Sequence, residues 1–300
     1  MRYITDKEIQ ALNIEPRMCV ERVRDAFMMK PECQLPPKVH VHPQGNDFIT
    51  TMPCLLPPSY HKFGVKVVSR ANGRKPALKS HFMMTDSITG ELEAIFETDW
   101  ITAMRTGAVA TLAIKTFRKS NAKNYALIGL GSTARATLTC LIHEFADEHL
   151  NFKLFRYKSQ AEQIKAEYSS YTNVTFTIVD TTEELVSDAD VVISCITDAD
   201  GLLLEDEKLF KPGVLVVPVH TRGFQNCDRV FDKVFADDTG HVCGFKYFNE
   251  FRQYAELTEV LLEQKHGRES DTERILTYNI GLGLHDILYS YRIAKMLSII

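Results

Sequence analysis

The sequence predicts an α/β protein in which a parallel sheet wound with helices is inserted into a mixed α+β domain. Strand-like and helix-like stretches alternate from about residue 119 onward, which is typical of a parallel sheet with helical connections. Before this point the chain is proline-rich and carries short strand-like runs. The closing stretch GLGLHDILYSYRIAKML reads as a helix that returns to the first part. We therefore expect one domain of residues 1–118 plus 281–300 and a second of residues 119–280.

The first domain is expected to have a helical start over residues 6–29 and to continue as short strands. The strand-like runs are LPPKVHVHP, DFITTMP, FGVKVVS and HFMMTDSITGELEAIF. The last of them contains the turn sequence Ser87-Ile-Thr-Gly90 between two apolar stretches, which predicts a hairpin. TDWITAMRTGAVATLAIKTF then reads as a helix, with Thr98 or Asp99 as its N-cap.

A glycine motif opens the second domain. The strand-forming residues 125–128 are followed by GLGSTA and then by a helix-like segment, residues 135–145. Glycines let the backbone approach an anion closely, and the free N–H groups of a helix's first turn point at that anion. The spacing GxGxxA is a small-residue variant of the dinucleotide fingerprint. The motif residues expected to bind a dinucleotide are Gly129, Gly131, Ser132, Thr133 and Ala134.

The context of this motif favours a Rossmann domain over a structural glycine turn in some other doubly wound domain. The strand-like runs FKLFRY, VTFTIVD, DVVISCI, GVLVVPV and KVFADD follow it. Ligands of an open α/β sheet lie beyond the carboxyl ends of its strands. We therefore expect Thr197, after the fourth strand, to border the nicotinamide of NAD or NADP, and residues 220–222, after the fifth, to lie near that crevice. For each of residues 220–222 the alternative is a loop residue with no ligand.

The end of the second strand bears on the choice of cofactor. Domains that prefer NAD carry an acidic residue there for the ribose 2′-hydroxyl, but this chain has Arg156, Tyr157 and Lys158. A guanidinium can pair with a 2′-phosphate through two hydrogen bonds. The stretch therefore favours NADP(H) over NAD(H), and a solvated basic loop is the alternative.

Composition excludes several classes of protein. A formal net charge of −4 with 25% charged residues gives no basic excess for nucleic acid, and no apolar run is long enough for a membrane span. The first ten residues lack the apolar core of a signal peptide, and the seven cysteines are scattered. We expect a cytoplasmic protein with reduced thiols. His40 and His42 lack a third ligand at a recognisable spacing, so no metal site is expected.

An ordered set of short motifs resembles the ornithine cyclodeaminase/mu-crystallin family. It comprises Pro37-Lys38, Met52-Pro53, Gly64-Val-Lys66-Val-Val, Asp86 with Thr89-Gly90, Thr102-Ala-Met-Arg105-Thr106-Gly-Ala, GLGSTA, and Gly281-Leu-Gly-Leu-His-Asp286. The resemblance implies a homodimer, a nicotinamide cofactor and a small amino-, imino- or keto-acid substrate. It also implies that Lys38, Lys66 and Arg105 are substrate-site groups and that Thr106 belongs to the cofactor site.

The chemistry of two of these side chains suits oxidation of an amino acid at its α-carbon. Arg105 can hold the substrate carboxylate, because a guanidinium is always charged and forks onto two oxygens; a salt-bridged helix arginine is the alternative. Lys66 lies inside an apolar strand, where burial lowers a lysine's pKa toward neutrality and suits it to proton transfer. The alternative is an edge-strand lysine that points to water.

The loop after the fifth strand of the second domain departs from the family pattern. Members that release ammonia and cyclise ornithine carry an aspartate just past a glycine in this loop. The loop here reads HTRGFQNCD, which puts Gln225 at that position and leaves Asp228 as the nearest carboxylate. Glutamine cannot take a proton at neutral pH. Both residues are kept as candidate substrate-binding residues.

We therefore expect an NAD(P)-dependent oxidoreductase that moves a hydride between the nicotinamide and the α-carbon of a small L-amino acid or its imine. An amino-acid dehydrogenase or a ketimine reductase fits this description. The alternatives are a true ornithine cyclodeaminase, which makes proline and ammonia, and a non-catalytic NADPH- or ligand-binding protein like mu-crystallin.

Overall fold

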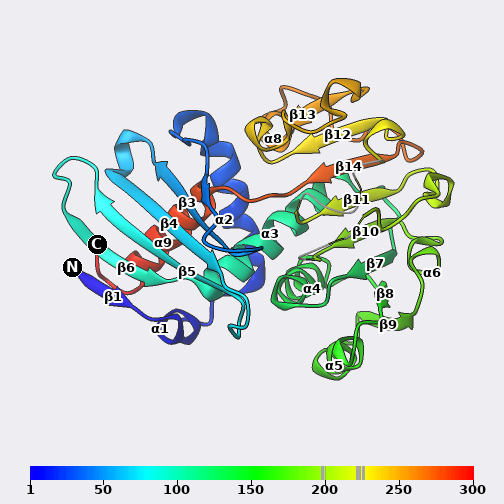
Figure 1. Cartoon of the computed structure of the whole chain (residues 1–300), viewed down its shortest axis with the longest axis horizontal. Helices are drawn as coiled ribbons and strands as arrows, with labels where there is room; N and C mark the ends of the chain where they lie inside the picture. Colours follow the sequence, from blue (N-terminus) through cyan, green and yellow to red (C-terminus); the bar gives the residue numbers. More distant parts are fainter. Residues whose placement is uncertain (197–198, 200, 221–223, 225–226) are drawn as a thin grey trace. The chain divides into compact units, whose positions relative to one another are not determined.

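The computed structural model in Figure 1 describes residues 1–196, 199, 201–220, 224 and 227–300. The chain folds as two compact units. Unit 1 consists of Met1–Arg105 and Gly281–Ile300, and unit 2 of Thr106–Ile280. The first boundary falls inside helix α3 (Asp99–Phe117), so one continuous helix contributes residues to both units.

Unit 1 is built on a six-stranded sheet with the strand order β1-β6-β5-β4-β3-β2. Strands β2 to β6 pair antiparallel, and β1 adds to β6 in parallel. The predicted hairpin is the β5–β6 pair, whose turn is fixed by the Asp86 carboxylate accepting from the N–H groups of Ile88 and Thr89. The strands are β1 (Arg2–Ile4), β2 (Val39–Val41), β3 (Phe48–Leu55), β4 (Lys62–Arg70), β5 (Leu78–Asp86) and β6 (Leu92–Glu97).

Helix α9 covers one face of this sheet. It packs on β3, β4 and β5 and against helix α2 (Figure 1). Strand side chains alternate between two faces, so one face of the sheet is buried under α9 and the other stays half-exposed. The unit's helices are α1 (Asp6–Ala11), α2 (Pro16–Met29), η1 (Lys30–Glu32), η2 (Pro58–Tyr60), the first part of α3, and α9 (Gly283–Met296).

The helical start predicted over residues 6–29 consists of two helices, which a short break separates. Helix α1 starts at a capping box between Thr5 and Glu8. The chain then turns at Asn13, which adopts a left-handed φ of 46°. Helix α2 begins with Pro16, whose missing N–H costs nothing at the first helical position.

Unit 2 is a doubly wound sheet of eight parallel strands in the order β13-β12-β14-β11-β10-β7-β8-β9. Every residue of β10, β11, β12 and β14 is buried, as expected for strands covered on both faces. The chain runs from β7 to β8 and β9 on one side and to β10 and β11 on the other. This reversal confirms the predicted Rossmann-type fold and places its switch point between β7 and β10.

The strands of unit 2 are β7 (Asn124–Ile128), β8 (Leu150–Phe155), β9 (Val174–Val179), β10 (Val191–Ser194), β11 (Leu215–Pro218), β12 (Lys233–Ala236), β13 (Tyr254–Glu256) and β14 (Ile275–Tyr278). Its helices besides α3 are α4 (Ser132–Glu144), α5 (Gln160–Glu167), α6 (Thr182–Val186), η3 (Glu207–Leu209), η4 (Cys227–Arg229), α7 (Thr239–Val242), η5 (Phe248–Glu250) and α8 (Leu257–Leu261).

The close packing of α3 on α4 gives a test of this fold. A Cβ added at Gly107 would lie 2.5 Å from the backbone carbon of Ala136, so neither backbone can yield cheaply. We expect Gly107→Ala to lower the free energy of unfolding by about 1–3 kcal/mol, the usual cost of overpacking. Gly244→Ala is the matched control, because nothing lies within 4 Å of its added Cβ. Urea denaturation of both variants checks this, and equal stabilities would contradict the helix contact.

Candidate active site

Three charged side chains meet in the core of unit 1. Strand β4 lies between β3 and β5, and Lys66 stands on its buried face in register with Met52 and Phe82. Lys66 Nζ donates a hydrogen bond of 2.9 Å to Asp286 Oδ1, and Arg105 Nε lies 3.4 Å from the same oxygen. The side chains of Lys66 and Asp286 are 0% exposed and that of Arg105 is 7% exposed. The lysine therefore does not point to water, because it stands on the face of the sheet that α9 covers.

Burial and the neighbouring charges set the protonation of this cluster. Burial lowers the pKa of Lys66 to about 7; the Arg105 guanidinium and Lys38 add to this effect, and Asp286 opposes it. Burial pushes the pKa of Asp286 upward, but Arg105 and Lys66 outweigh it and hold the pKa below its usual value. Near neutral pH both forms of Lys66 are populated, which is the condition for efficient proton transfer.

The segment that enters α9 fits around the arginine. Gly281 has a φ of +89°, and a Cβ at this position would lie 2.0 Å from Arg105 Nη1. A Cβ at Gly283 would lie 2.9 Å from the carbonyl oxygen of Met52 on β3. Glycine at these two positions therefore lets the chain pass under the guanidinium and lets α9 dock directly on the strand.

Asp286 is a member of this cluster that was not predicted from the sequence. It appeared in the closing motif but was given no role. Two signals were present in the sequence: a carboxylate in the first turn of an otherwise apolar helix, and a lysine in an apolar strand that needed a partner. Lys38, by contrast, was predicted. It is half-buried just before β2 and close enough to Lys66 to lower its pKa.

The predicted dinucleotide motif forms a tight turn at the switch point of unit 2. Gly129 ends β7 with a φ of +82°, and a Cβ there would lie 2.4 Å from the backbone of Cys195, just after β10. Gly131 precedes α4. Among the described residues, nothing lies within 4 Å of its would-be Cβ and no side chain caps the helix. The first N–H groups of α4, which include those of Ser132 and Thr133, are therefore open to a pyrophosphate. These residues fit a nicotinamide dinucleotide.

The three residues after β8 are exposed, and one of them is already paired. Arg156 Nε donates to Asp180 Oδ1 at 2.6 Å, and its Nη1 contacts Glu162. Tyr157 is 54% exposed, with Lys158 Nζ 5.2 Å from its ring centroid. Thr106 lies in α3 of unit 2, next to Gly107. Thr197 and Gln225, both named above as candidates, lie outside the described residues.

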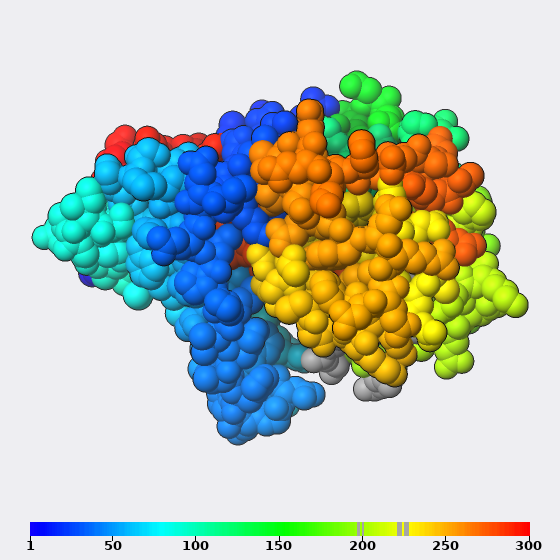
Figure 2. All heavy atoms as spheres, turned by 90° about the horizontal axis from the view of Figure 1, so that it is seen from above, coloured from blue at the N-terminus to red at the C-terminus, as the bar shows by residue number. Residues whose placement is uncertain are grey.

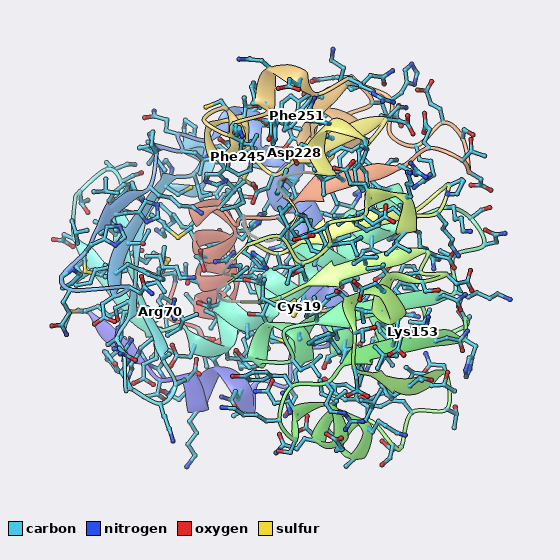
Figure 3. All side chains as sticks on the ribbon, turned by 45° about the vertical axis from the view of Figure 1, so that its right-hand side comes forward. Cys19, Arg70, Lys153, Asp228, Phe245 and Phe251 are labelled. Carbon is cyan, nitrogen blue, oxygen red and sulfur yellow. The ribbon has the colours of Figure 1, made fainter. Side chains whose placement is uncertain are left out.

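Asp228 lies in an aromatic part of unit 2. It is buried in η4, and its Oδ1 accepts a hydrogen bond from the hydroxyl of Tyr278 on β14, whose ring packs edge-on against Phe245. Figure 3 shows Asp228 in the same part of the unit as Phe245 and Phe251. Burial raises the pKa of Asp228 to about 6, with the Tyr278 hydrogen bond opposing it. This contact occupies one carboxyl oxygen of Asp228, whereas Oδ2 is buried without a hydrogen-bond partner among the described residues.

Within the described part of the chain, no helix is long and apolar enough to cross a membrane. The same part of the chain contains no group of three or more His, Cys, Asp or Glu side chains arranged to hold a metal.

The fold places the chain in the class of two-unit proteins that carry an inserted Rossmann-type dinucleotide domain. Its two distinctive features are the glycine turn at the switch point and the Lys66–Asp286–Arg105 cluster. Family comparison narrows this class. The chain belongs to the ornithine cyclodeaminase/mu-crystallin family, whose sequence profile matches residues 4–296.

Two characterised relatives show how the chain compares within this family. It is 25% identical over 268 residues to the nodulation efficiency protein NfeD of Rhizobium meliloti, covering 84% of this chain and 81% of that protein. It is 28% identical over 249 residues to the Delta(1)-pyrroline-2-carboxylate reductase of Bacillus thuringiensis subsp. konkukian, covering 75% and 74% of the two chains.

Solved structures share the fold over nearly the whole chain. The Delta(1)-pyrroline-2-carboxylate reductase of Thermococcus litoralis, in complex with NADH and L-proline, matches with a TM-score of 0.87 at 22% identity and covers 99% of this chain and 98% of that one. An archaeal alanine dehydrogenase dimer with bound NAD matches with a TM-score of 0.84 at 20% identity, covering 99% and 96%.

Proposed function

We propose that this protein is an NAD(P)H-dependent imine reductase or amino-acid dehydrogenase that acts on a small α-imino or α-amino acid. The observation that carries the proposal is the fully buried Lys66, which shares one carboxylate oxygen with Arg105. Two cations on one carboxylate leave a positive charge when Lys66 is protonated, which suits an anionic substrate. The names of relatives with the same fold, two of them Delta(1)-pyrroline-2-carboxylate reductases, support the same reaction class.

In this mechanism the side chains of unit 1 bind the substrate and supply a proton. Arg105, helped by Lys38, holds the substrate carboxylate. Lys66 in its ammonium form donates a proton to the imine nitrogen and becomes a neutral amine. Protonation of the imine raises the electrophilicity of its α-carbon. A bound nicotinamide supplies the hydride in this direction and takes it up in the reverse one. Gly129, Gly131 and the first turn of α4 would hold the dinucleotide.

A true cyclodeaminase has less support. The chain has Gln225 where ammonia-releasing members carry an aspartate. The nearest carboxyl group in the sequence is that of Asp228, which is buried in unit 2 and accepts a hydrogen bond from Tyr278 through one of its oxygens. Hydride transfer to an imine needs no such base. We therefore propose a reductase that does not close a ring with loss of ammonia.

We further propose that NADP(H) binds more tightly than NAD(H). Arg156, Tyr157 and Lys158 stand where NAD-preferring domains carry a carboxylate. Asp180 and Glu162 already balance the charge of Arg156, so Lys158 contributes the additional positive charge. A 2′-phosphate would compete with the two carboxylates for the guanidinium.

A homodimer formed through unit 1 is proposed from its second sheet face. Opposite to α9, an apolar row crosses five strands in register, made of Tyr3, Ile95, Met83, Val65 and Pro53. Tyr3 is 48% and Met83 42% exposed. In the space-filling view of Figure 2, the blue and light-blue segments of unit 1, which include β2 to β4, lie at the surface of the protein. A contiguous apolar sheet face of this kind is typical of an interface, and a second copy of the chain is the proposed partner.

The reaction is tested by NADPH oxidation in the presence of Delta(1)-pyrroline-2-carboxylate, or of pyruvate with ammonia. In the active assay, we expect Lys66→Met to lower kcat by about 10²–10⁴-fold, the usual contribution of general acid–base catalysis. Lys62→Met is the control. Lys62 is a buried lysine of the same strand, paired with Glu93 at 3.0 Å outside the cluster. NADPH binding without turnover, or proline and ammonia formed from ornithine, would overturn the proposal.

Cofactor preference is tested by titrating NADPH and NADH onto Arg156→Ala and Lys158→Ala. We expect each variant to lose affinity mainly for NADPH, by roughly 5–20-fold, because a charge-assisted hydrogen bond contributes about 1–2 kcal/mol. Lys153→Ala removes a cation from β8 whose Nζ donates to the backbone of Glu184 and Ser187, and should leave both affinities unchanged. An equal loss of affinity for NADPH and NADH would show that neither residue contacts the 2′-phosphate.

Assembly is tested by sedimentation velocity at micromolar concentration. The unsubstituted protein should sediment as a dimer, and Met83→Lys should shift it to monomer, because a charge would then be buried without a partner. Leu202→Lys introduces the same charge at an exposed leucine of unit 2 and should remain dimeric. A monomeric unsubstituted protein, or a dimeric Met83→Lys variant, would contradict an interface on this sheet face.

A further inference from the structure

Asp286 occupies an unusual place for a carboxylate. It lies in the first turn of α9, where every residue from Gly283 to Ser290 is buried, and it is 0% exposed. Burying a charge is unfavourable unless it is paired. The helix N-terminus favours a negative charge, but the closest compensation comes from the two cations described above. The buried charge of Asp286 is therefore compensated by Lys66 and Arg105, and their charges are compensated by Asp286.

The contacts of Asp286 are unevenly divided between its two oxygens. Oδ1 accepts the hydrogen bond from Lys66 and faces Arg105 Nε. Oδ2 is buried and has no hydrogen-bond partner among the described residues. A carboxylate present only to neutralise charge would gain more by using both oxygens. In the observed arrangement, Lys66 and Arg105 instead both lie next to a single oxygen, Oδ1.

Other charged groups around Lys66 act against its protonation. Arg105 and Lys38 are like charges, and burial disfavours the ammonium form as well. Asp286 favours this form through both its charge and its hydrogen bond, and it opposes the effects of burial, Arg105 and Lys38. The titratable and charged groups that face the pair are Arg105 on α3, Lys38 before β2, Cys54 on β3 and His285 on α9.

We propose that Asp286 is a positioning residue that keeps Lys66 protonated and aimed for proton donation while fixing the orientation of Arg105. The inference rests on the proposed function, because it assigns those tasks to Lys66 and Arg105. Asp286 acts through these two side chains. The N–H bond of the Lys66 ammonium breaks, the proton passes to the imine nitrogen, and the electron pair stays on Nζ. A bound nicotinamide would supply the hydride that the α-carbon takes up. Lys66 is left as a neutral amine beside Asp286 and must take up a proton again before the next turnover.

The residues just before Asp286 support this role. Gly281 places its Cα directly against Arg105 Nη1, and Gly283 seats α9 on the backbone of β3. The segment from residue 281 to residue 286 therefore accommodates the arginine at one end and pairs with both cations at the other. Six consecutive residues set the positions of the two groups that the proposed reaction requires.

The test is the pH dependence of imine reduction by Asp286→Asn. Reduction needs protonated Lys66, so kcat/KM should fall as pH rises through the pKa of this lysine. Removing the carboxylate charge lowers that pKa further. The descending limb should therefore move to lower pH by about 1–3 units, the usual effect of an opposite charge at this distance. KM should also rise, because Arg105 loses its restraint. Asp286→Glu keeps the charge, so its limb should stay in place while kcat falls.

A second measurement does not depend on turnover. The Lys66 amine can be titrated by ¹⁵N NMR in lysine-labelled protein, with its resonance identified by its absence from Lys66→Met. The midpoint should lie near 7 in the unsubstituted protein and lower in Asp286→Asn. If no imino acid is reduced but this midpoint shifts as expected, the proposed function fails and the role of Asp286 in holding the proton stands.

Two controls separate positioning from simple loss of stability. Asp190→Asn removes another buried, ion-paired carboxylate, that of unit 2 bound to Lys119 and Lys211, and should leave the pH limb in place. In a Lys66→Met background, Asp286→Asn should lower kcat less than twofold further, because it acts through the lysine. An unshifted limb and NMR midpoint in Asp286→Asn, or fully additive losses of kcat, would overturn the proposal. If Asp286→Asn does not fold, two other results would overturn the proposal. One is a shift of the descending pH limb in Asp286→Glu, and the other is an NMR titration midpoint of Lys66 near 10 in the unsubstituted protein.

Discussion

The ion pair between Lys66 and Asp286 is the constraint on which the organisation of unit 1 depends. A lysine in the middle of an interior strand cannot reach water, so its charge has to be met inside the protein. The partner comes from a helix 220 residues further along the chain. Removing one member of such a pair typically costs about 3–5 kcal/mol, since it leaves the other charge buried alone. The closing helix must therefore return to the first sheet for that sheet to keep its lysine.

The same constraint explains the shape of the surrounding chain. Helix α9 can bring its carboxylate to β4 only if its first turn sits close to β3, and glycine at position 283 permits that approach. Arg105 then needs space beside the carboxylate, which Gly281 leaves open. The short closing motif thus reflects steric and electrostatic demands of one buried site. The glycines and the aspartate are parts of a single arrangement.

The sequence predicted those features that local patterns encode. Alternating strands and helices, together with GxGxxA, led to the Rossmann-type sheet and its glycine turn, because both are set within a few residues. Partners far apart in the chain were not accessible in this way. Asp286 was missed as the counterion of Lys66, and the pairing of Arg156 with Asp180 was missed because it joins the ends of two different strands. The break between α1 and α2 was not predicted, because it depends on the left-handed conformation of Asn13.

Unit 1 is discontinuous in sequence, whereas unit 2 is one continuous segment, and this difference bears on how the protein comes to be folded during synthesis. Unit 2 has its complete set of strands once Ile280 has left the ribosome, and domains generally fold as they emerge. The first sheet emerges earlier but lacks α9, so its buried face and the Lys66 side chain have no cover. It has to wait for the whole of unit 2 to be made before its core can close. The residues of the first sheet are thus made long before the helix that covers them, and Lys66 is made 220 residues before its counterion Asp286.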